Sequence, residues 1–136
     1  MSQVRLTKVE QSFQKESGIT SWSTKVPYII VENFPKLGLF TSLRFLEWVA
    51  ENPEGVISLP TGKTPEHFIK WTEHFLSNWD NKELIRLREK YGLDLKKKPD
   101  LRGLHFVQID EFYPISPAQH NSFCNYVNTF YIDKFG

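Results

Sequence analysis

Two short segments hold the side chains best suited to chemistry. The first, Thr61-Gly62-Lys63-Thr64, combines two hydroxyls, an ammonium group and a flexible glycine. Directly before a helix, such a loop also offers free backbone N–H groups, and together these donors suit an anion, most simply a phosphate. An ordinary capped connection between a strand and a helix explains the same spacing equally well.

Gly62-Lys63-Thr64 invites comparison with the nucleotide-binding P-loop, but the spacing does not fit. That motif needs a glycine five residues before its second glycine, and Ile57 stands at this position, inside a predicted strand. Pro60 also stiffens a stretch that the P-loop keeps free to wrap around phosphates. The sequence therefore argues against a nucleotide site of this kind.

Asp110 and Glu111 form the second segment, at the carboxyl end of an apolar run. Neighbouring side chains on an extended chain point to opposite sides, so only one of the two can face a given site. We expect the other to hold the loop that follows. A carboxylate beside an anion-binding loop suits proton transfer next to a carbonyl group. The alternative is a carboxylate that only caps Ser116 or the following loop.

The other nucleophilic and metal-ligating side chains form no recognisable motif. His67 and His74 lie seven residues apart on one predicted helix, too far to share an ion, and His105 is expected mid-strand as a structural residue. His120, which follows the acidic pair, is the histidine that we place near a ligand. Cys124 is expected to pack within a helix, and no G-x-S-x-G signature occurs. The sequence predicts no metal site.

Hydrophobic periodicity places both segments in an α/β protein with a parallel sheet and flanking helices. Short apolar runs predict strands, and apolar residues recurring every three or four positions predict helices. Strands are expected at 28–31, 56–59 and 104–109. The first helix is expected from Asn33 to Ala50, and the second follows an N-cap at Thr64, with Pro65 as its first residue. A third helix is expected from Leu84 to a stop at Gly92, and a fourth after Ser122, with Phe123, Val127 and Phe130 on one face. The alternating order is typical of parallel strands. Ligands bind at the carboxyl ends of such strands, where both segments fall.

Composition restricts the class of protein further. The 136 residues carry 17 Lys+Arg against 16 Asp+Glu, a net charge of +1, so charge gives no case for a nucleic-acid or membrane partner. One cysteine excludes an internal disulfide, and without an apolar leader or spanning stretch a reducing, cytoplasmic setting fits best. Residues 1–26 are polar and are expected to lie on the surface or fray, and Lys96–Lys98 is expected in a solvated loop.

The number of predicted strands is small for a parallel sheet. Such a sheet is covered on both faces and usually has about five or six strands, whereas three are predicted here. The last predicted helix carries an apolar face and ends at Gly136. We therefore expect residues 27–136 to be the N-terminal part of a longer domain.

The two segments, in this order, resemble motifs of the glucosamine-6-phosphate deaminases (isomerases). Leu59-Pro60-Thr61-Gly62-Lys63-Thr64-Pro65 is similar to their phosphate loop, L-P-T-G-x-T-P with Gly or Ser at x. Gln108-Ile109-Asp110-Glu111-Phe112 is similar to their N-M-D-E-Y segment, and His120 to Phe123 resembles the stretch of His, Ser and aromatic residues that follows it. The resemblance covers about residues 27–135.

The resemblance implies a modified Rossmann-like, doubly wound domain that converts glucosamine 6-phosphate to fructose 6-phosphate and ammonia. By resemblance, Asp110 moves a proton between carbons 1 and 2 of the sugar, and Thr61, Gly62, Lys63 and Thr64 hold its phosphate. Glu111 and His120 would support the site. The implied partner is a small-molecule sugar phosphate, and no metal or organic cofactor is implied. The oligomeric state, a homo-oligomer included, is left open.

The sequence departs from the family pattern in three ways, and these differences leave other functions open. Lys63 replaces a small Gly or Ser, and the stretch between the two motifs is longer than usual. The family's Gly-rich segment with Asp, His and Glu, which opens the sugar ring, is not found, so the chain alone is expected to be inactive. The related 6-phosphogluconolactonases have Arg where this chain has Phe112. A 6-phosphogluconolactonase-like hydrolase and a non-catalytic sugar-phosphate-binding module are the alternatives.

Overall fold

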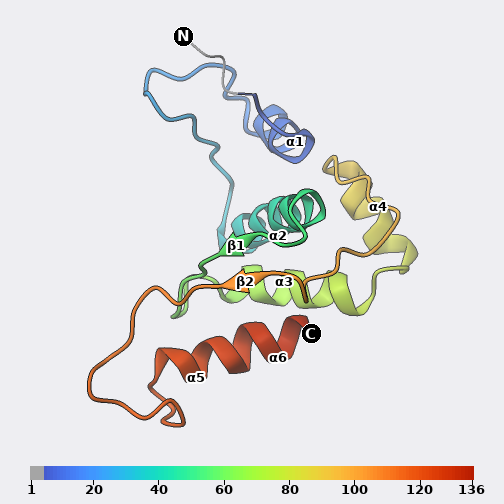
Figure 1. Ribbon diagram of the computed structural model, residues 1–136. Helices are drawn as coiled ribbons and strands as arrows, with labels where there is room; N and C mark the ends of the chain where they lie inside the picture. Colours follow the sequence, from blue (N-terminus) through green and yellow to red (C-terminus); the bar gives the residue numbers. More distant parts are fainter. Residues whose placement is uncertain (1–4) are drawn as a thin grey trace.

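The computed structural model describes residues 5–136 and shows a mostly helical chain with one two-stranded parallel sheet (Figure 1). The helices are α1 (Lys8–Ser17), α2 (Phe34–Glu51), α3 (Glu66–Ser77), α4 (Lys82–Lys90), α5 (Phe123–Val127) and α6 (Asp133–Phe135), and a π-helical turn, η1 (Asn128–Ile132), joins the last two. The strands are β1 (Val56–Ile57) and β2 (His105–Phe106). Parallel strands combined with helices agree with the predicted α/β class. Across residues 5–136, no helix has both the length and the apolar character needed to span a bilayer.

The two strands pair in parallel, with Ile57 opposite Phe106. Both are shorter than the predicted strands at 56–59 and 104–109. Backbone pairing extends to the Val107 N–H, which donates to the Ile57 carbonyl at 2.9 Å. The Ser58 hydroxyl then donates to the Val107 carbonyl at 2.6 Å and occupies the next acceptor along the ladder. The regular pairing ends at this side-chain contact.

The predicted strand at 28–31 is wrong, because this segment pairs with neither strand. Ile29 and Val31 pack against the helical core. Tyr28 and Ile30 are 44% and 63% exposed. The indole N–H of Trp22 donates to the Tyr28 carbonyl at 2.6 Å, so a side chain takes a backbone acceptor that a sheet would use. The segment is extended and half-buried, but helices rather than strands are its neighbours.

The polar N-terminal segment contains α1, so the expectation of a surface or frayed extension is wrong for this helix. Thr7 and Glu10 form a reciprocal capping box, which satisfies two backbone N–H groups at its start. Phe13 is fully buried and stacks on Phe40 and Tyr91, with ring centroids 4.4 and 4.5 Å away. Residues 1–4, which belong to the same expectation, lie outside the described residues.

Helix starts agree with the predicted caps at Asn33 and Ser122, whose side chains each accept a backbone N–H three residues on. The predicted N-cap at Thr64 is wrong. The Glu66 N–H donates to the Lys63 carbonyl at 3.2 Å, so a turn precedes α3 and the helix begins one residue later than expected. Pro65 occupies the cap position and provides no side-chain cap bond.

The predicted shared face of Phe123, Val127 and Phe130 is interrupted by η1. The Asp133 N–H donates to the Asn128 carbonyl, five residues back, so this turn holds one residue more than an α-helical turn. The extra residue rotates the following side chains. Phe130 is consequently 42% exposed, and Tyr131 is buried in its place.

The β1–β2 ribbon has one buried face and one open face. Ile57 and Phe106 pack against a cluster from α2, α3 and the continuous α5–η1–α6 helix. Val56, Val107 and Ile109 project from the other face and are 65%, 53% and 64% exposed. The loops that leave both strands emerge on the same side of the molecule, where α3 and α5 begin (Figure 1). This arrangement brings the two sequence motifs to one edge of the ribbon.

Candidate functional site

The loop that follows β1 is shaped by Gly62, whose φ of +96° lies in the left-handed region that favours glycine. A Cβ added there would meet no heavy atom within 4 Å, so the backbone conformation rather than space requires a glycine. In the described part of the chain, the backbone N–H groups of Thr61, Gly62, Lys63 and Thr64 donate no hydrogen bond. Within the described residues the loop therefore holds four consecutive unpaired N–H donors.

Two tyrosine hydroxyls hold the loop through its carbonyl groups. The hydroxyl of Tyr126, on α5, donates to the Gly62 carbonyl at 2.6 Å. The hydroxyl of Tyr131, on η1, donates to the Pro60 carbonyl at 2.6 Å. Neither tyrosine is recognisable as a site residue from the sequence, because a contact across more than sixty positions leaves no local signal.

The carboxylate of Glu111 is committed to the start of α5. It accepts the Ser122 hydroxyl at 2.6 Å and the backbone N–H groups of Phe123 and Cys124 at 3.0 and 2.9 Å. The Phe112 N–H donates to the same carboxylate at 3.0 Å. These donors, with the Ser122 hydroxyl the strongest, lower the pKa of Glu111 to about 2. The expectation that one member of the acidic pair holds the following loop is confirmed for Glu111.

Asp110 is exposed, and it follows β2 as the 61–64 loop follows β1. The register pairs Ile57 with Phe106, and Thr61 and Asp110 each come four residues after their member of this pair. The side-chain amide of Gln108 donates to the backbone carbonyl of Asp110 at 2.7 Å. Within residues 5–136, the Asp110 carboxylate makes no hydrogen bond or ion pair. It is the free carboxylate of the acidic pair.

His120 is not brought to the loop by any contact of the described residues. Its side chain is exposed, in the turns that precede Ser122. The Ser122 N–H donates to the Gln119 carbonyl at 3.0 Å, and this bond closes the turn around His120. The role of His120 as site support stays a prediction.

Lys63 faces a hollow of about 500 Å³ between the loop, α3 and α5–η1. Two other lysines line this hollow, and both are paired: Lys70 with Glu66 at 2.6 Å and Lys134 with Glu73 at 3.3 Å. Lys63 has no carboxylate partner among the described residues. Its ammonium group is exposed and available to an anion.

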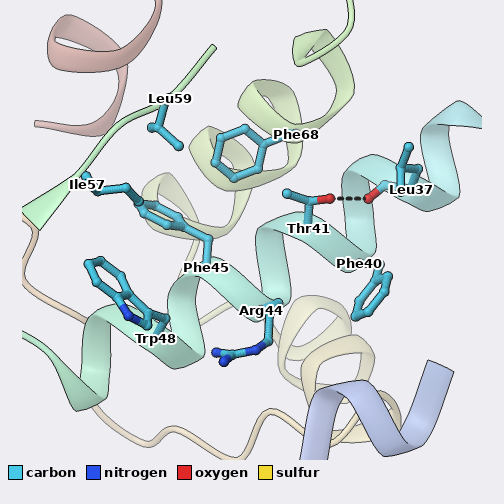
Figure 2. Close-up of a pocket in the computed structure, with 9 residues that line it drawn as sticks. All are labelled: Leu37, Phe40, Thr41, Arg44, Phe45, Trp48, Ile57, Leu59 and Phe68. Carbon is cyan, nitrogen blue, oxygen red and sulfur yellow. Dashed lines mark hydrogen bonds between the residues drawn. The ribbon is translucent and has the colours of Figure 1, made fainter. Parts of the chain in front are cut away.

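A separate groove of about 390 Å³ lies beside β1 and is apolar in character (Figure 2). Phe45 and Trp48 of α2 surround it together with Ile57 and Leu59 (Figure 2). Its charged lining residue, Arg44, is already paired with a carboxylate of α1 at 2.9 Å. The lining of this groove is mostly apolar, so the two loops remain the candidate site.

Comparison with known proteins finds a relative with the expected activity. The chain is 31% identical over 83 residues to a glucosamine-6-phosphate deaminase of Bacillus velezensis. The match covers 61% of this chain and 27% of the relative, so the chain spans about a quarter of the length of that enzyme. No protein-family model and no solved structure matches the chain. The chain is thus similar over part of its length to a glucosamine-6-phosphate deaminase, as its two motifs predict.

Proposed function

We propose that residues 27–136 form the N-terminal part of a sugar-phosphate isomerase/deaminase of the glucosamine-6-phosphate type. The activity is proposed for a protein that carries this chain together with the remainder of a Rossmann-like, doubly wound domain. The similarity to a glucosamine-6-phosphate deaminase over 83 residues supports the choice of substrate. The short parallel ribbon agrees with such a domain, although two strands make only a small part of one.

One observation carries the proposal. Thr61 and Asp110 each come four residues after a paired residue of two parallel strands, which supports a donor loop and a free carboxylate at one edge of the ribbon. Ligands of parallel α/β proteins bind at this edge. A sugar phosphate anchored on the N–H groups of the loop would bring its carbon chain towards Asp110.

In the proposed reaction, Asp110 acts on the open-chain form of glucosamine 6-phosphate. Its carboxylate removes the proton from carbon 2, next to the carbonyl at carbon 1, and returns a proton to carbon 1. The amino-bearing carbon 2 becomes an imine, which water hydrolyses to fructose 6-phosphate and ammonia. Anchoring the phosphate at the far end of the sugar fixes the distance between the reacting carbons and the base. Lys63, which has no carboxylate partner among the described residues, would add a positive charge to the loop.

The test is ammonia release from glucosamine 6-phosphate by the full-length protein. Asp110→Asn keeps the shape of the side chain and removes the base, so kcat should fall by about 10²- to 10⁴-fold. KM should change far less, because the phosphate contacts remain. Asp94→Asn, an exposed residue in the loop after α4, is the matched control and should leave both constants unchanged.

Three results would contradict this assignment in different ways. Near-normal turnover by Asp110→Asn would remove Asp110 from the mechanism. Hydrolysis of 6-phosphogluconolactone without ammonia release would indicate the hydrolase alternative. A folded wild type that binds the sugar phosphate without turnover would indicate a binding module.

A further inference from the structure

The loop after β1 is held from one side, by a single helical segment. Tyr126 and Tyr131 lie on α5 and η1, which form one continuous helix after the acidic pair (Figure 1). Their hydroxyls donate to the carbonyls of Gly62 and Pro60, two residues apart in the loop, each at 2.6 Å. The loop is therefore fixed by a pair of bonds to its alternate peptide groups.

These bonds determine which way the peptide N–H groups of the loop point. In a planar trans peptide, the carbonyl and the N–H of the next residue point in opposite directions. Because the Gly62 carbonyl points at Tyr126, the Lys63 N–H points away from it. The Thr61 N–H points away from Tyr131 for the same reason. Two donors are thus turned together to the side of the loop that faces away from α5 and η1.

The helix that carries the two tyrosines is itself anchored to the acidic pair. The Glu111 carboxylate accepts the Ser122 hydroxyl and the N–H groups of Phe123 and Cys124, which are the first residues of α5. One turn further on, Tyr126 reaches the loop. Glu111 and Tyr126 therefore connect the backbone next to Asp110 with the backbone of Gly62, through one short helix.

We propose that Tyr126 is a positioning residue of the phosphate loop: its hydroxyl fixes the Gly62 peptide so that the Lys63 N–H faces the substrate phosphate. This role rests on the proposed function, since it assigns the phosphate to the same loop. Gly62 needs such a restraint more than other residues do, because a glycine peptide rotates with little steric resistance. Burial raises the pKa of Tyr126, so the hydroxyl stays protonated and remains a donor at neutral pH.

Tyr126 is a better test residue than Tyr131. Tyr131 is 2% exposed and its ring packs in the core against Phe68 and Phe106, so any change there also affects stability. Tyr126 is partly exposed, and Tyr126→Phe removes only the hydroxyl while the ring can keep its contacts. Tyr91→Phe is the matched control, because the hydroxyl of Tyr91 contacts Lys36 in another part of the molecule.

The experiment measures ligand affinity and loop order on the same ¹⁵N-labelled full-length protein. Inorganic phosphate and glucosamine 6-phosphate are titrated separately, and the amide signals of Thr61 and Lys63 are followed. Tyr126→Phe should raise the Kd for both ligands about fivefold, the ratio that corresponds to one net hydrogen bond of about 1 kcal/mol. The amide order parameters of Gly62 and Lys63 should fall in the ligand-free variant. Tyr91→Phe should change neither quantity.

The possible outcomes separate the role of Tyr126 from the proposed function. Wild-type order parameters and Kd values in Tyr126→Phe would overturn the role of Tyr126, whatever the wild type binds. A wild type that ignores glucosamine 6-phosphate would instead contradict the proposed function, and the order parameters would still decide whether Tyr126 fixes the loop. Equal losses in Tyr126→Phe and Tyr91→Phe would show a general stability effect and would also overturn the proposal.

Discussion

Glu111 shows how a single carboxylate can organise the end of a motif. It accepts five hydrogen bonds, and three of them come from the first residues of α5 and its cap. A carboxylate at a helix N-terminus also interacts favourably with the partial positive charge there. Because its carboxylate is held by these hydrogen bonds, Glu111 is not available as a base. Asp110 is the unpaired member of the acidic pair.

The stability that Glu111 contributes should depend on pH. Its pKa falls from its ordinary value of 4.5 to about 2 in the folded protein, because the charged form accepts the helix donors. A lowered folded-state pKa gives stability that is present above pH 4.5 and is lost as the pH falls from 4.5 towards 2. Urea unfolding over this range should show a shallower loss of stability in Glu111→Gln than in the wild type. Parallel curves for the two proteins would contradict this account, and Glu54→Gln, on an exposed turn, is the control.

The site was only partly predictable from its residues. Alternation along an extended chain predicts that Asp110 and Glu111 have different surroundings, and the structure agrees. The glycine in the loop is recognisable because a turn before a helix often needs a left-handed residue. The role of Tyr126 could not be predicted from the sequence. A tyrosine in a helix is indistinguishable from an apolar core residue until the partner of its hydroxyl, here the Gly62 carbonyl, is known.

At the scale of elements, α2 and α3 approach each other closely at Gly38. A Cβ added to Gly38 would overlap the Cβ of His67 and lie 2.7 Å from the backbone nitrogen of Phe68. Gly38→Ala should therefore cost about 1–3 kcal/mol of unfolding free energy, the usual penalty for overpacking. Thr41→Ala, exposed on the same helix, should stay within about 0.5 kcal/mol of the wild type. Chemical denaturation measures both, and a neutral Gly38→Ala would show that the helices can separate without cost.

Elements with clear caps and one apolar face are the ones that the sequence predicts well. Asn33 begins α2 as expected, and Gly92, with a φ of +83°, follows the end of α4. The predicted strand at 28–31 is wrong because a β-branched run specifies an extended backbone but not a neighbouring strand to pair with. The helix α1 is not predicted from the sequence, because a short helix needs few apolar residues when its partners supply the rest of the core.

At the scale of the whole molecule, α1 contributes to the core through Phe13. This ring lies between Phe40 of α2 and Tyr91 at the end of α4, and so joins three helices. Phe13→Ala should cost about 3–5 kcal/mol, as expected for a buried aromatic residue that leaves a cavity. Val26→Ala, at a position that is 73% exposed, is the control and should be close to neutral. A small effect of Phe13→Ala in thermal or urea unfolding would mean that α1 is a dispensable extension after all.

The extra residue in η1 affects how this chain should be aligned with its relatives. A chain that lacks the insertion would continue its α-helix through 128–132, and its buried aromatic residue would stand one position earlier than Tyr131. An ungapped alignment would then pair Tyr131 with a solvent-facing side chain and lower the apparent identity from there to the end. Placing a one-residue gap within 128–132 would restore the correspondence of the buried positions. Sequences of distant relatives are therefore best matched to this chain by their buried positions on both sides of η1, Val127 before it and Tyr131 within it.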